Sequence, residues 1–427
     1  MALLQLALDF LELPRALKAA REAVPGGVDW LEAGTPLIKS EGLDAVRSLR
    51  KEFPRIFLVA DLKTMDTGRL EVEAAAKAGA NLVMVMGVAP LSTLRECAEA
   101  GANYGVKIGV DFLGVADAPA LAKRLLDIGI DHVSVHTGVD EQMEGKTPFD
   151  AIRAIRPMPL VIGAAGGLHS GNAGEAVRAG ADVIVVGGAI TKSEDALEAT
   201  RRIKTVLSTG ESRPTDLFKR VSGGDVRNAF ETVSTANVSD ALHRSGEIRG
   251  IPPLRAGLKL VGRAVTVRTL PGDWAKPVEA IDVAQPGEVV VIAAGGVEPA
   301  VWGELATESA KGKGLAGVVI DGAIRDSGEI RRLNFPAFAR IVTPTAGEPK
   351  GFGEINVPVK IAGVAVHPGD WVIGDDDGIV IVPLGRATEI ANRAMDVLER
   401  ENRLRKEIRE GTTLSKVADL LRWEKIS

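Results

Sequence analysis

Cysteine is nearly absent from this sequence, which contains a single one, Cys97, among 427 residues. One thiol can form neither an internal disulfide nor a thiolate cage for a metal, so both kinds of site are excluded. Cys97 stands in the helix-like stretch STLRECAEAG, where we expect a buried structural thiol. This cysteine usage fits a reducing compartment, and we expect the protein to work in the cytoplasm.

Long apolar runs and an excess of basic charge are missing as well. No segment reaches the roughly 18 uninterrupted apolar residues that a membrane span requires. The opening MALLQLALDFLEL has no basic leader and is interrupted by Asp9 and Glu12, so we do not expect a signal peptide. The formal net charge of −5 offers no footprint for nucleic acid or an anionic membrane, and neither is an expected partner.

What the sequence has in abundance is short apolar runs, about one every 25 residues in the first half. They are LLQLALDF, VDWLEAG, IFLVADLKT, LVMVMG, KIGVDFLG, HVSVHTG, PLVIGAAGG and VIVVGGAI, separated by amphipathic stretches of helical period. Eight such units in roughly 200 residues predict an α/β fold, a (β/α)8 TIM barrel, over residues 1–210.

A second domain follows a polar stretch rich in turn-forming residues. STGESRPTD opens the predicted linker, 208–217, and the chain is long enough for two cores. Beyond it, over 218–427, the runs LVGRAVTVRTL, EVVVIAAGG, GVVIDGAIRD, PAFARIV and WVIGDDDGIVIVP predict strands, with one internal helix in VWGELATESAKGKG. This pattern favours a C-terminal α/β domain, an α+β sandwich, and the charged tail 386–426 has helical period.

Ionisable residues gather where the predicted barrel strands end. Asp61, Lys63 and Asp66 lie in VADLKTMDTG, and strand alternation would place Asp61 and Lys63 on one face. Four other strands end in the same way, at Asp9, Glu32, Asp111 and His136. Isolated, an Asp-x-Lys is usually a structural ion pair, but so many converging charges are costly unless a ligand or metal uses them.

Glycine-rich turns end the seventh and eighth predicted strands. Gly166 and Gly167 belong to GAAGGL, and Gly187 and Gly188 belong to VVGGAIT. These are the turns whose backbone N–H groups bind phosphate in TIM barrels, so we expect a phosphorylated substrate there.

Together these motifs resemble the orotidine-phosphate decarboxylase superfamily over residues 1–207, and the wording ADLKTMDTG is similar to its hexulose-phosphate synthase branch. The resemblance implies Mg²⁺ held by Glu32 and Asp61. It implies an aldehyde-lyase of the ribulose monophosphate pathway, which adds formaldehyde to ribulose 5-phosphate, or reverses that reaction, through an enediolate of the sugar phosphate. The product would be a 3-hexulose 6-phosphate.

The same resemblance implies a role for each remaining residue. His136 would move the proton, Lys63 would stabilise the oxyanion, and Asp66 and Asp9 would fix Lys63 and the substrate hydroxyls. The alternative is a keto-gulonate-phosphate-type decarboxylase, which forms a similar enediolate by losing CO₂; Thr64-Met65 favours the synthase.

The second half resembles the family of class II 4-hydroxy-4-methyl-2-oxoglutarate aldolases and ribonuclease E activity regulators. WGELA, VVIDGAIRD and the spacing Arg325-Asp326-x-x-Glu329 carry that resemblance over about 218–420. It implies that Arg325 binds the carboxylate of a pyruvate-like oxoacid, that Asp326 binds Mg²⁺, and that Glu304 assists proton transfer. The regulators keep a similar Arg-Asp, so a non-catalytic regulatory or assembly domain is the alternative to a bifunctional fusion. Both families imply oligomers, and a homohexamer satisfies both interfaces.

Overall fold

The computed structural model describes residues 2–143, 146–215, 220–221 and 226–417. Its contacts divide the chain into two compact units, one of residues 1–142, 146–219 and 402–427 and the other of 143–145 and 220–401. Among the described residues, no helix has the length and apolar character needed to cross a membrane.

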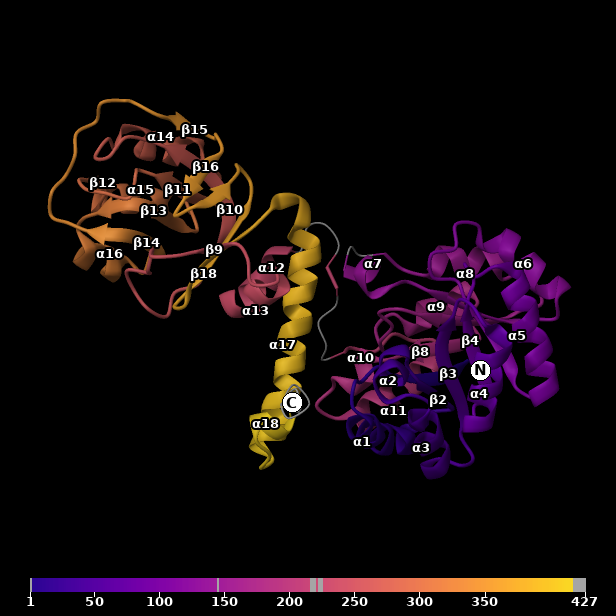
Figure 1. Cartoon of the computed structure of the whole chain (residues 1–427). Helices are drawn as coiled ribbons and strands as arrows, with labels where there is room; N and C mark the ends of the chain where they lie inside the picture. The colour runs from indigo at the N-terminus through magenta and orange to yellow at the C-terminus, as the bar shows by residue number, and fades with distance from the viewer. Residues whose placement is uncertain (1, 144–145, 216–219, 222–225, 418–427) are drawn as a thin grey trace, which may run out of the picture. The chain divides into compact units, whose positions relative to one another are not determined.

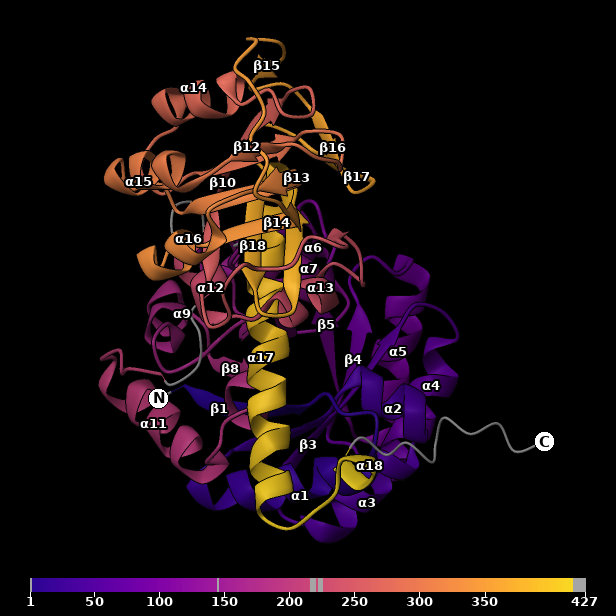
Figure 2. The same cartoon turned by 90° about the vertical axis from the view of Figure 1, so that its left-hand side faces the viewer.

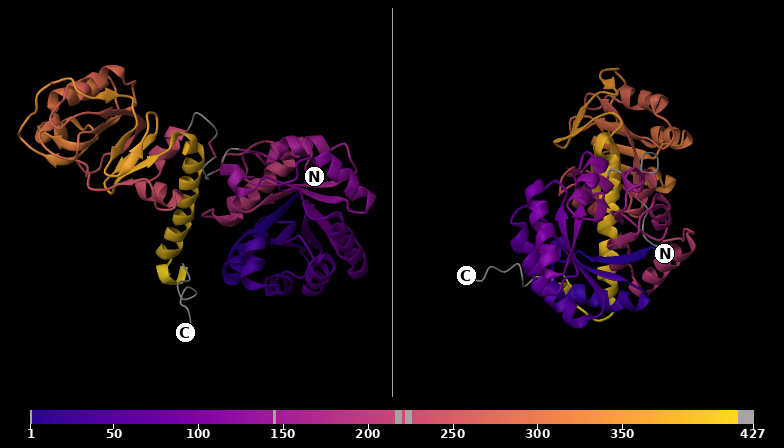
Figure 3. Two further views of the ribbon diagram at one scale, coloured as in Figure 1. Left: turned by 45° about the horizontal axis from the view of Figure 1, so that its top comes forward. Right: turned by 90° about the vertical axis from the view of Figure 1, so that its right-hand side faces the viewer.

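The first unit is a closed barrel of eight parallel strands in sequence order (Figures 1 and 3). Each strand corresponds to one of the predicted apolar runs, so the predicted TIM barrel is confirmed. The strands are β1 Leu3–Leu8, β2 Trp30–Ala33, β3 Phe57–Thr64, β4 Leu82–Met86, β5 Lys107–Asp111, β6 His132–His136, β7 Val161–Ala165 and β8 Val183–Val186.

Helices connect consecutive strands and surround the barrel. They are α1 Leu13–Ala23, α2 Thr35–Glu41, α3 Asp44–Glu52, α4 Gly68–Ala78, α5 Leu91–Tyr104, α6 Ala118–Asp127, α7 Val139–Met143, α8 Phe149–Ile155, α9 Ala173–Ala179, α10 Gly188–Thr191 and α11 Ala196–Thr209. Glycines with positive φ follow several of them, among them Gly79, Gly180 and Gly210, because an αL residue closes a helix end with little strain. α11 ends at Thr209, so it includes the first two residues of the predicted linker, 208–217. The last two residues of that linker, 216 and 217, lie outside the described residues.

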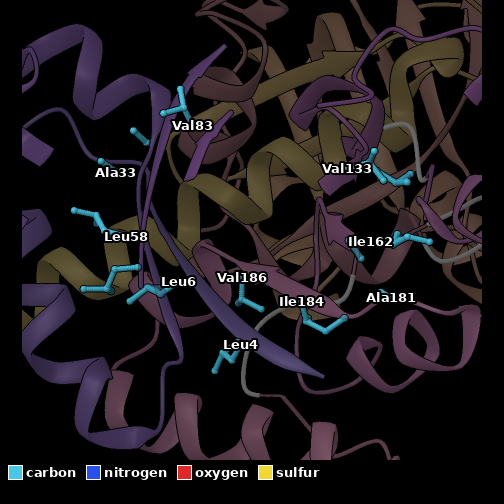
Figure 4. Packing of buried hydrophobic residues seen from close by; sticks show 14 of the residues in the cluster. Leu4, Leu6, Ala33, Leu58, Val83, Val133, Ile162, Ala181, Ile184 and Val186 are labelled. Carbon is cyan, nitrogen blue, oxygen red and sulfur yellow. The ribbon is translucent and has the colours of Figure 1, made fainter. Parts of the chain in front are cut away.

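Strand alternation divides the barrel's side chains into two sets. Leu4, Leu6 and Leu8 are fully buried among helix residues in the layer between strands and helices, part of which Figure 4 shows. The residues between them, Gln5 and Ala7, face the barrel interior. Asp9 continues this inward set one position beyond the end of β1, which brings it to the barrel mouth.

The second unit is built around a nine-stranded mixed sheet in the order β12-β13-β11-β10-β18-β19-β9, with β14 on β13 and β15 on β10. Its strands are β9 Glu247–Ile248, β10 Leu260–Arg268, β11 Val289–Ala293, β12 Ala300–Trp302, β13 Gly317–Ile324, β14 Ala337–Val342, β15 Glu354–Ile355, β18 Trp371–Asp375 and β19 Gly378–Val382. Helices α14 Ala275–Val283, α15 Glu304–Gly312 and α16 Ser327–Leu333 pack on one face (Figure 2). The hairpin of β16 Val359–Ile361 and β17 Val364–Val366 packs on the other.

The predicted α/β class of this unit is confirmed, but two details of its prediction were wrong. The run WVIGDDDGIVIVP is not one strand but the hairpin of β18 and β19, which turns at Asp376–Asp377. Besides the predicted helix, which is α15, the unit contains α14, α16, α12 Val226–Thr232 and α13 Thr235–Ala241. Trp302 belongs to β12 rather than to α15. Short helices between sheet strands give weak periodicity, which explains why the sequence did not indicate them.

The charged tail forms α17 Ala387–Arg409 and α18 Leu414–Val417, as its helical period predicted, while residues 418–426 lie outside the described residues. The last turns of α17 also make side-chain contacts. Within the barrel unit, the Arg403 guanidinium lies 3.0 Å from the Glu22 carboxylate and donates to the Ser193 carbonyl oxygen at 2.7 Å.

Candidate active site

Five barrel strands bring acidic and basic side chains together at their carboxyl ends. The Lys63 ammonium lies 3.0 Å from Asp61 Oδ2 and 2.7 Å from Asp111 Oδ2. The same Asp111 oxygen lies 3.0 Å from His136 Nδ1, and Asp111 Oδ1 accepts the backbone N–H of Leu113. Asp111 therefore joins the lysine of β3 to the histidine of β6.

A bulge in β3, rather than simple alternation, aims Lys63 at this cluster. The register between β3 and β4 shifts between Asp61 and Thr64, and Lys63 has a φ of 50°. A side chain in this left-handed region is rare outside glycine and marks a constrained position. The expectation that Asp61 and Lys63 meet was right, but regular alternation was the wrong reason for it.

The pKa shifts in this cluster arise because several charged groups lie close together where little water reaches them. Burial alone would raise the pKa of Asp111, but His136 and Lys63 hold it at about 2. Burial would lower the pKa of Lys63, yet Asp61 and Asp111 raise it above its ordinary value. Lys63 is therefore a fixed cation and Asp111 a fixed anion at any pH near neutrality.

Glu32 and Asp9 show the opposite shift. Burial and the charges of Asp61 and Asp9 raise the pKa of Glu32 well above its usual range, against a hydrogen bond from Gln5. The loss of surrounding water, together with Asp61, raises the pKa of Asp9. Negative charge at this end of the barrel exceeds what Lys63 neutralises, so an additional cation would be stabilised there.

One oxygen of Asp61 has no hydrogen-bond partner in the part of the chain that the structure describes. Asp61 Oδ1 is buried and, among the residues that the structure describes, accepts no hydrogen bond, whereas Oδ2 accepts from Thr35 at 2.7 Å and from Lys63. A buried, unsatisfied carboxylate oxygen is costly. Mg²⁺ takes oxygen ligands and is commonly held by one or two carboxylates together with water and substrate oxygens, so the Glu32 and Asp61 pair fits it. The described residues contain no ready-made group of three or more His, Cys, Asp or Glu metal ligands.

Asp9 is seated against two glycines. A Cβ atom at Gly34 would lie 2.2 Å from Asp9 Oδ1 and 2.9 Å from the Leu8 carbonyl oxygen, and one at Gly187 would lie 3.5 Å from Asp9 Oδ2. Gly34, which directly precedes α2, is therefore a site residue that sequence reasoning missed. The sequence signal that could have identified Gly34 is that a glycine stands two residues after Glu32.

Asp111, rather than Asp66, contacts Lys63. The Asp66 carboxylate is exposed and accepts the backbone N–H of the next residue, Thr67. The ion pairs of Lys63 are with Asp61 and Asp111, so the expectation that Asp66 fixes Lys63 was wrong. Asp111 was noted at the end of β5 but was given no role, although its position matches that of the other strand-end groups.

The expected phosphate glycines lie at the ends of β7 and β8. Gly166 and Gly167 have φ of 107° and 66°, which only glycine adopts readily, and Gly187 directly precedes α10, which begins at Gly188. A Cβ at Gly166 would lie 2.4 Å from the Thr137 carbonyl oxygen. The four glycines carry no side chain, so none blocks the approach of a phosphate group to the backbone of these turns.

In the second unit the structure brings the three expected residues to one corner. The Arg325 Nε atom lies 3.4 Å from Asp326 Oδ2, and that oxygen accepts the backbone N–H of Glu304 at 3.1 Å. Asp326 has a φ of 57° and directly precedes α16. Arg325 and Asp326 are both partly exposed and paired with each other, while Glu304 contributes its backbone rather than its carboxylate.

The closed barrel with a half-buried lysine, buried carboxylates and a histidine at its carboxyl ends defines a (β/α)8 enzyme. Residues 2–203 match the family model described as "Orotidine 5'-phosphate decarboxylase / HUMPS family", and residues 235–381 match "RraA-like: Aldolase/RraA". The 3-hexulose-6-phosphate synthase of Bacillus subtilis is 35% identical over 48% of this chain and 99% of its own length. That of Methylomonas aminofaciens is 38% identical over 48% of this chain and 98% of its own.

A solved structure of the RNA-processing inhibitor RraA from Thermus thermophilis is 30% identical over 35% of this chain and 92% of its own, with a TM-score of 0.33. The chain belongs to the orotidine 5'-phosphate decarboxylase / HUMPS family through its barrel, to which an RraA-like domain is fused. It is an enzyme of the lyase class.

Gly34→Ala should lower the catalytic rate of the barrel by about 10²-fold, the cost of misplacing a reacting group by about 1 Å. The new methyl group would displace Asp9, while the φ of −67° at this residue suits alanine. Initial rates measure the loss. Gly312→Ala, at a position with nothing within 4 Å of the added Cβ, is the control. Wild-type activity in Gly34→Ala would show that the position of the Asp9 carboxylate is unimportant for catalysis.

Proposed function

We propose that the barrel catalyses the Mg²⁺-dependent aldol addition of formaldehyde to ribulose 5-phosphate, giving 3-hexulose 6-phosphate, or the reverse reaction. The observation that carries this proposal is the single Asp111 oxygen that holds both Lys63 and His136 beside the carboxylates of Asp61 and Glu32. The names of the two synthases that match the barrel at 35% and 38% identity support it.

His136 is suited to move the proton of the sugar phosphate. With a pKa of about 2, Asp111 is ionised and can only accept a hydrogen bond, so Nδ1 of His136 carries the hydrogen. The other ring nitrogen, Nε2, then has a free lone pair and can remove the proton from C1 of ribulose 5-phosphate. C1 of the resulting enediolate attacks the formaldehyde carbon as the C2 carbonyl re-forms. The formaldehyde C=O π bond becomes an alkoxide, which takes the proton back from His136 Nε2 and leaves 3-hexulose 6-phosphate.

Lys63 supplies the positive charge for the oxyanion that develops. Its pKa is raised, so it stays protonated, and its two carboxylate partners fix the ammonium in position before the reaction. Glu32 and Asp61 would hold Mg²⁺, which would supply further positive charge to the developing oxyanion. Asp9 and Asp66 remain available to bind substrate hydroxyls.

The glycine turns after β7 and β8 would bind the phosphate group. Gly166, Gly167, Gly187 and Gly188 have no side chain to block the approach of an anion, and their backbone N–H groups would donate to it. The alternative, a keto-gulonate-phosphate-type decarboxylase, would use the same turns and the same enediolate. Formation of hexulose from formaldehyde, as against release of CO₂ from a keto-gulonate phosphate, separates the two reactions.

Removal of divalent cations should abolish condensation of ribulose 5-phosphate with formaldehyde by the full chain. The buried Asp61 oxygen and the raised pKa of Glu32 both point to a missing positive charge. Formaldehyde consumption is measured with EDTA and again after Mg²⁺ is added in excess. An unchanged rate under chelation would exclude the metal assignment while leaving the aldol reaction in place.

Lys63→Ala and Asp111→Asn should each lower kcat/KM by about 10²–10³-fold, or roughly 3–4 kcal/mol of transition-state stabilisation. The first removes the cation, and the second removes the charge that positions both Lys63 and His136. Asp66→Asn tests the other candidate anchor for Lys63 and should cost less than Asp111→Asn, because the Asp66 carboxylate accepts the backbone N–H of Thr67 and its proposed role is limited to a substrate hydroxyl. Equal losses for Asp66→Asn and Asp111→Asn would restore Asp66 as the residue that fixes Lys63.

For the second unit we propose a Mg²⁺-dependent class II aldolase activity on a pyruvate-like oxoacid, with Arg325 on the carboxylate, Asp326 on the metal and Glu304 in proton transfer. The match to the Aldolase/RraA family and the shared corner of these residues support it. A non-catalytic regulatory or assembly domain is the alternative. We further propose a cytoplasmic homohexamer, since both families resembled form shared interfaces.

The full chain carrying Lys63→Ala, which silences the barrel, should release pyruvate from 4-hydroxy-4-methyl-2-oxoglutarate when Mg²⁺ is present. Adding Arg325→Ala should abolish that release, because the oxoacid carboxylate loses its cation. A lactate dehydrogenase-coupled assay measures pyruvate, and light scattering on the same samples gives the oligomer mass. If the chain is hexameric but releases no pyruvate, the result favours a non-catalytic assembly role for the second unit.

A further inference from the structure

Thr35 and Gln5 donate hydrogen bonds to the two carboxylates that are proposed to bind the metal. Thr35, the first residue of α2, donates its hydroxyl to Asp61 Oδ2 at 2.7 Å. Gln5, in β1, donates its amide Nε2 to Glu32 Oε2 at 2.5 Å. All four side chains are buried.

The contacts of Thr35 fix how the Asp61 carboxylate is turned. The Thr35 hydroxyl also lies 3.0 Å from the Asp61 backbone carbonyl oxygen, but it has one hydrogen, which the shorter contact with an anionic oxygen attracts more strongly. Oδ2 thus receives two donors, Thr35 and Lys63, and the buried Oδ1 receives none from the described residues. Donors confined to one oxygen leave the other available to a ligand.

Gln5 acts on Glu32 from deeper in the barrel. In the parallel pair of β1 and β2, Ala7 is the partner of Glu32, so Gln5 faces the interior one layer below and Asp9 one layer above. Glutamine is an unusual choice for the interior of a barrel core, because its amide has to be satisfied. Its hydrogen bond to Glu32 meets that need and holds one carboxylate oxygen in place.

We infer that Thr35 and Gln5 are positioning residues that orient Asp61 and Glu32 toward a shared divalent cation. This inference rests on the proposed function for the cation itself, but not on the identity of the sugar substrate. A side chain that orients a metal ligand through a hydrogen bond typically changes metal affinity by about 10–100-fold when it is removed.

The test is the affinity of the full chain for Mg²⁺, measured by titration calorimetry without substrate. Thr35→Val keeps the shape of the side chain and removes the hydroxyl, and Gln5→Met removes the amide at nearly the same length. Each should raise the Kd for Mg²⁺ by about 10–100-fold. Thr35→Ser retains the hydroxyl and should bind Mg²⁺ with an affinity close to wild type.

Thr200→Val is the matched control. Thr200 is a fully buried threonine in α11 whose hydroxyl, within the described part of the chain, donates to the Ala196 carbonyl oxygen alone, so its loss should leave Mg²⁺ affinity unchanged. Thermal unfolding of each variant in EDTA shows whether the metal-free fold is intact. At saturating Mg²⁺ the rates of Thr35→Val and Gln5→Met should recover to within several-fold of wild type, whereas a purely structural defect would persist.

The outcomes separate this inference from the proposed function. Wild-type Mg²⁺ affinity in both Thr35→Val and Gln5→Met overturns the positioning role and leaves the metal assignment standing. A wild-type chain that binds no Mg²⁺ overturns both. If Thr35→Val unfolds in EDTA, weakened Mg²⁺ binding by a folded Gln5→Met supports the inference, and unchanged binding rejects it.

Discussion

The ion pair between Asp111 and Lys63 is the interaction on which the rest of the barrel site depends. Asp111 keeps its charge because Lys63 and His136 share one of its oxygens, and Lys63 stays protonated because Asp111 and Asp61 surround it. Neither charge would be tolerated at this depth without the other. Their pairing also selects the His136 tautomer that leaves Nε2 free to act as a base.

Backbone geometry makes this crowding possible. The bulge in β3 gives Lys63 its positive φ and brings it beside Asp61, and Gly34 has no side chain where Asp9 needs space. These are local departures from regular structure, and they cluster at the end of the barrel where chemistry is expected. The other barrel strands pair without register shifts, and their side chains that face the helices form one apolar core, which supplies a rigid frame around the strained residues.

The two units distribute their charges differently. In the barrel, several carboxylates are buried with a single lysine, and one carboxylate oxygen has no partner among the described residues. In the RraA-like unit, Arg325 and Asp326 are partly exposed and paired with each other. A substrate would have to separate that pair, whereas a cation entering the barrel would complete an arrangement already in place.

The sequence by itself determined the barrel, its strand count and the group of residues at its mouth, because apolar runs with a regular spacing and polar residues at their ends are local signals. It also identified the Arg325 corner of the second unit. Only the tertiary structure decided that Asp111, rather than Asp66, holds Lys63, and that Thr35, Gln5 and Gly34 support the carboxylates. Those contacts join residues on different strands, and a bulge or a single free oxygen leaves no trace in composition or periodicity.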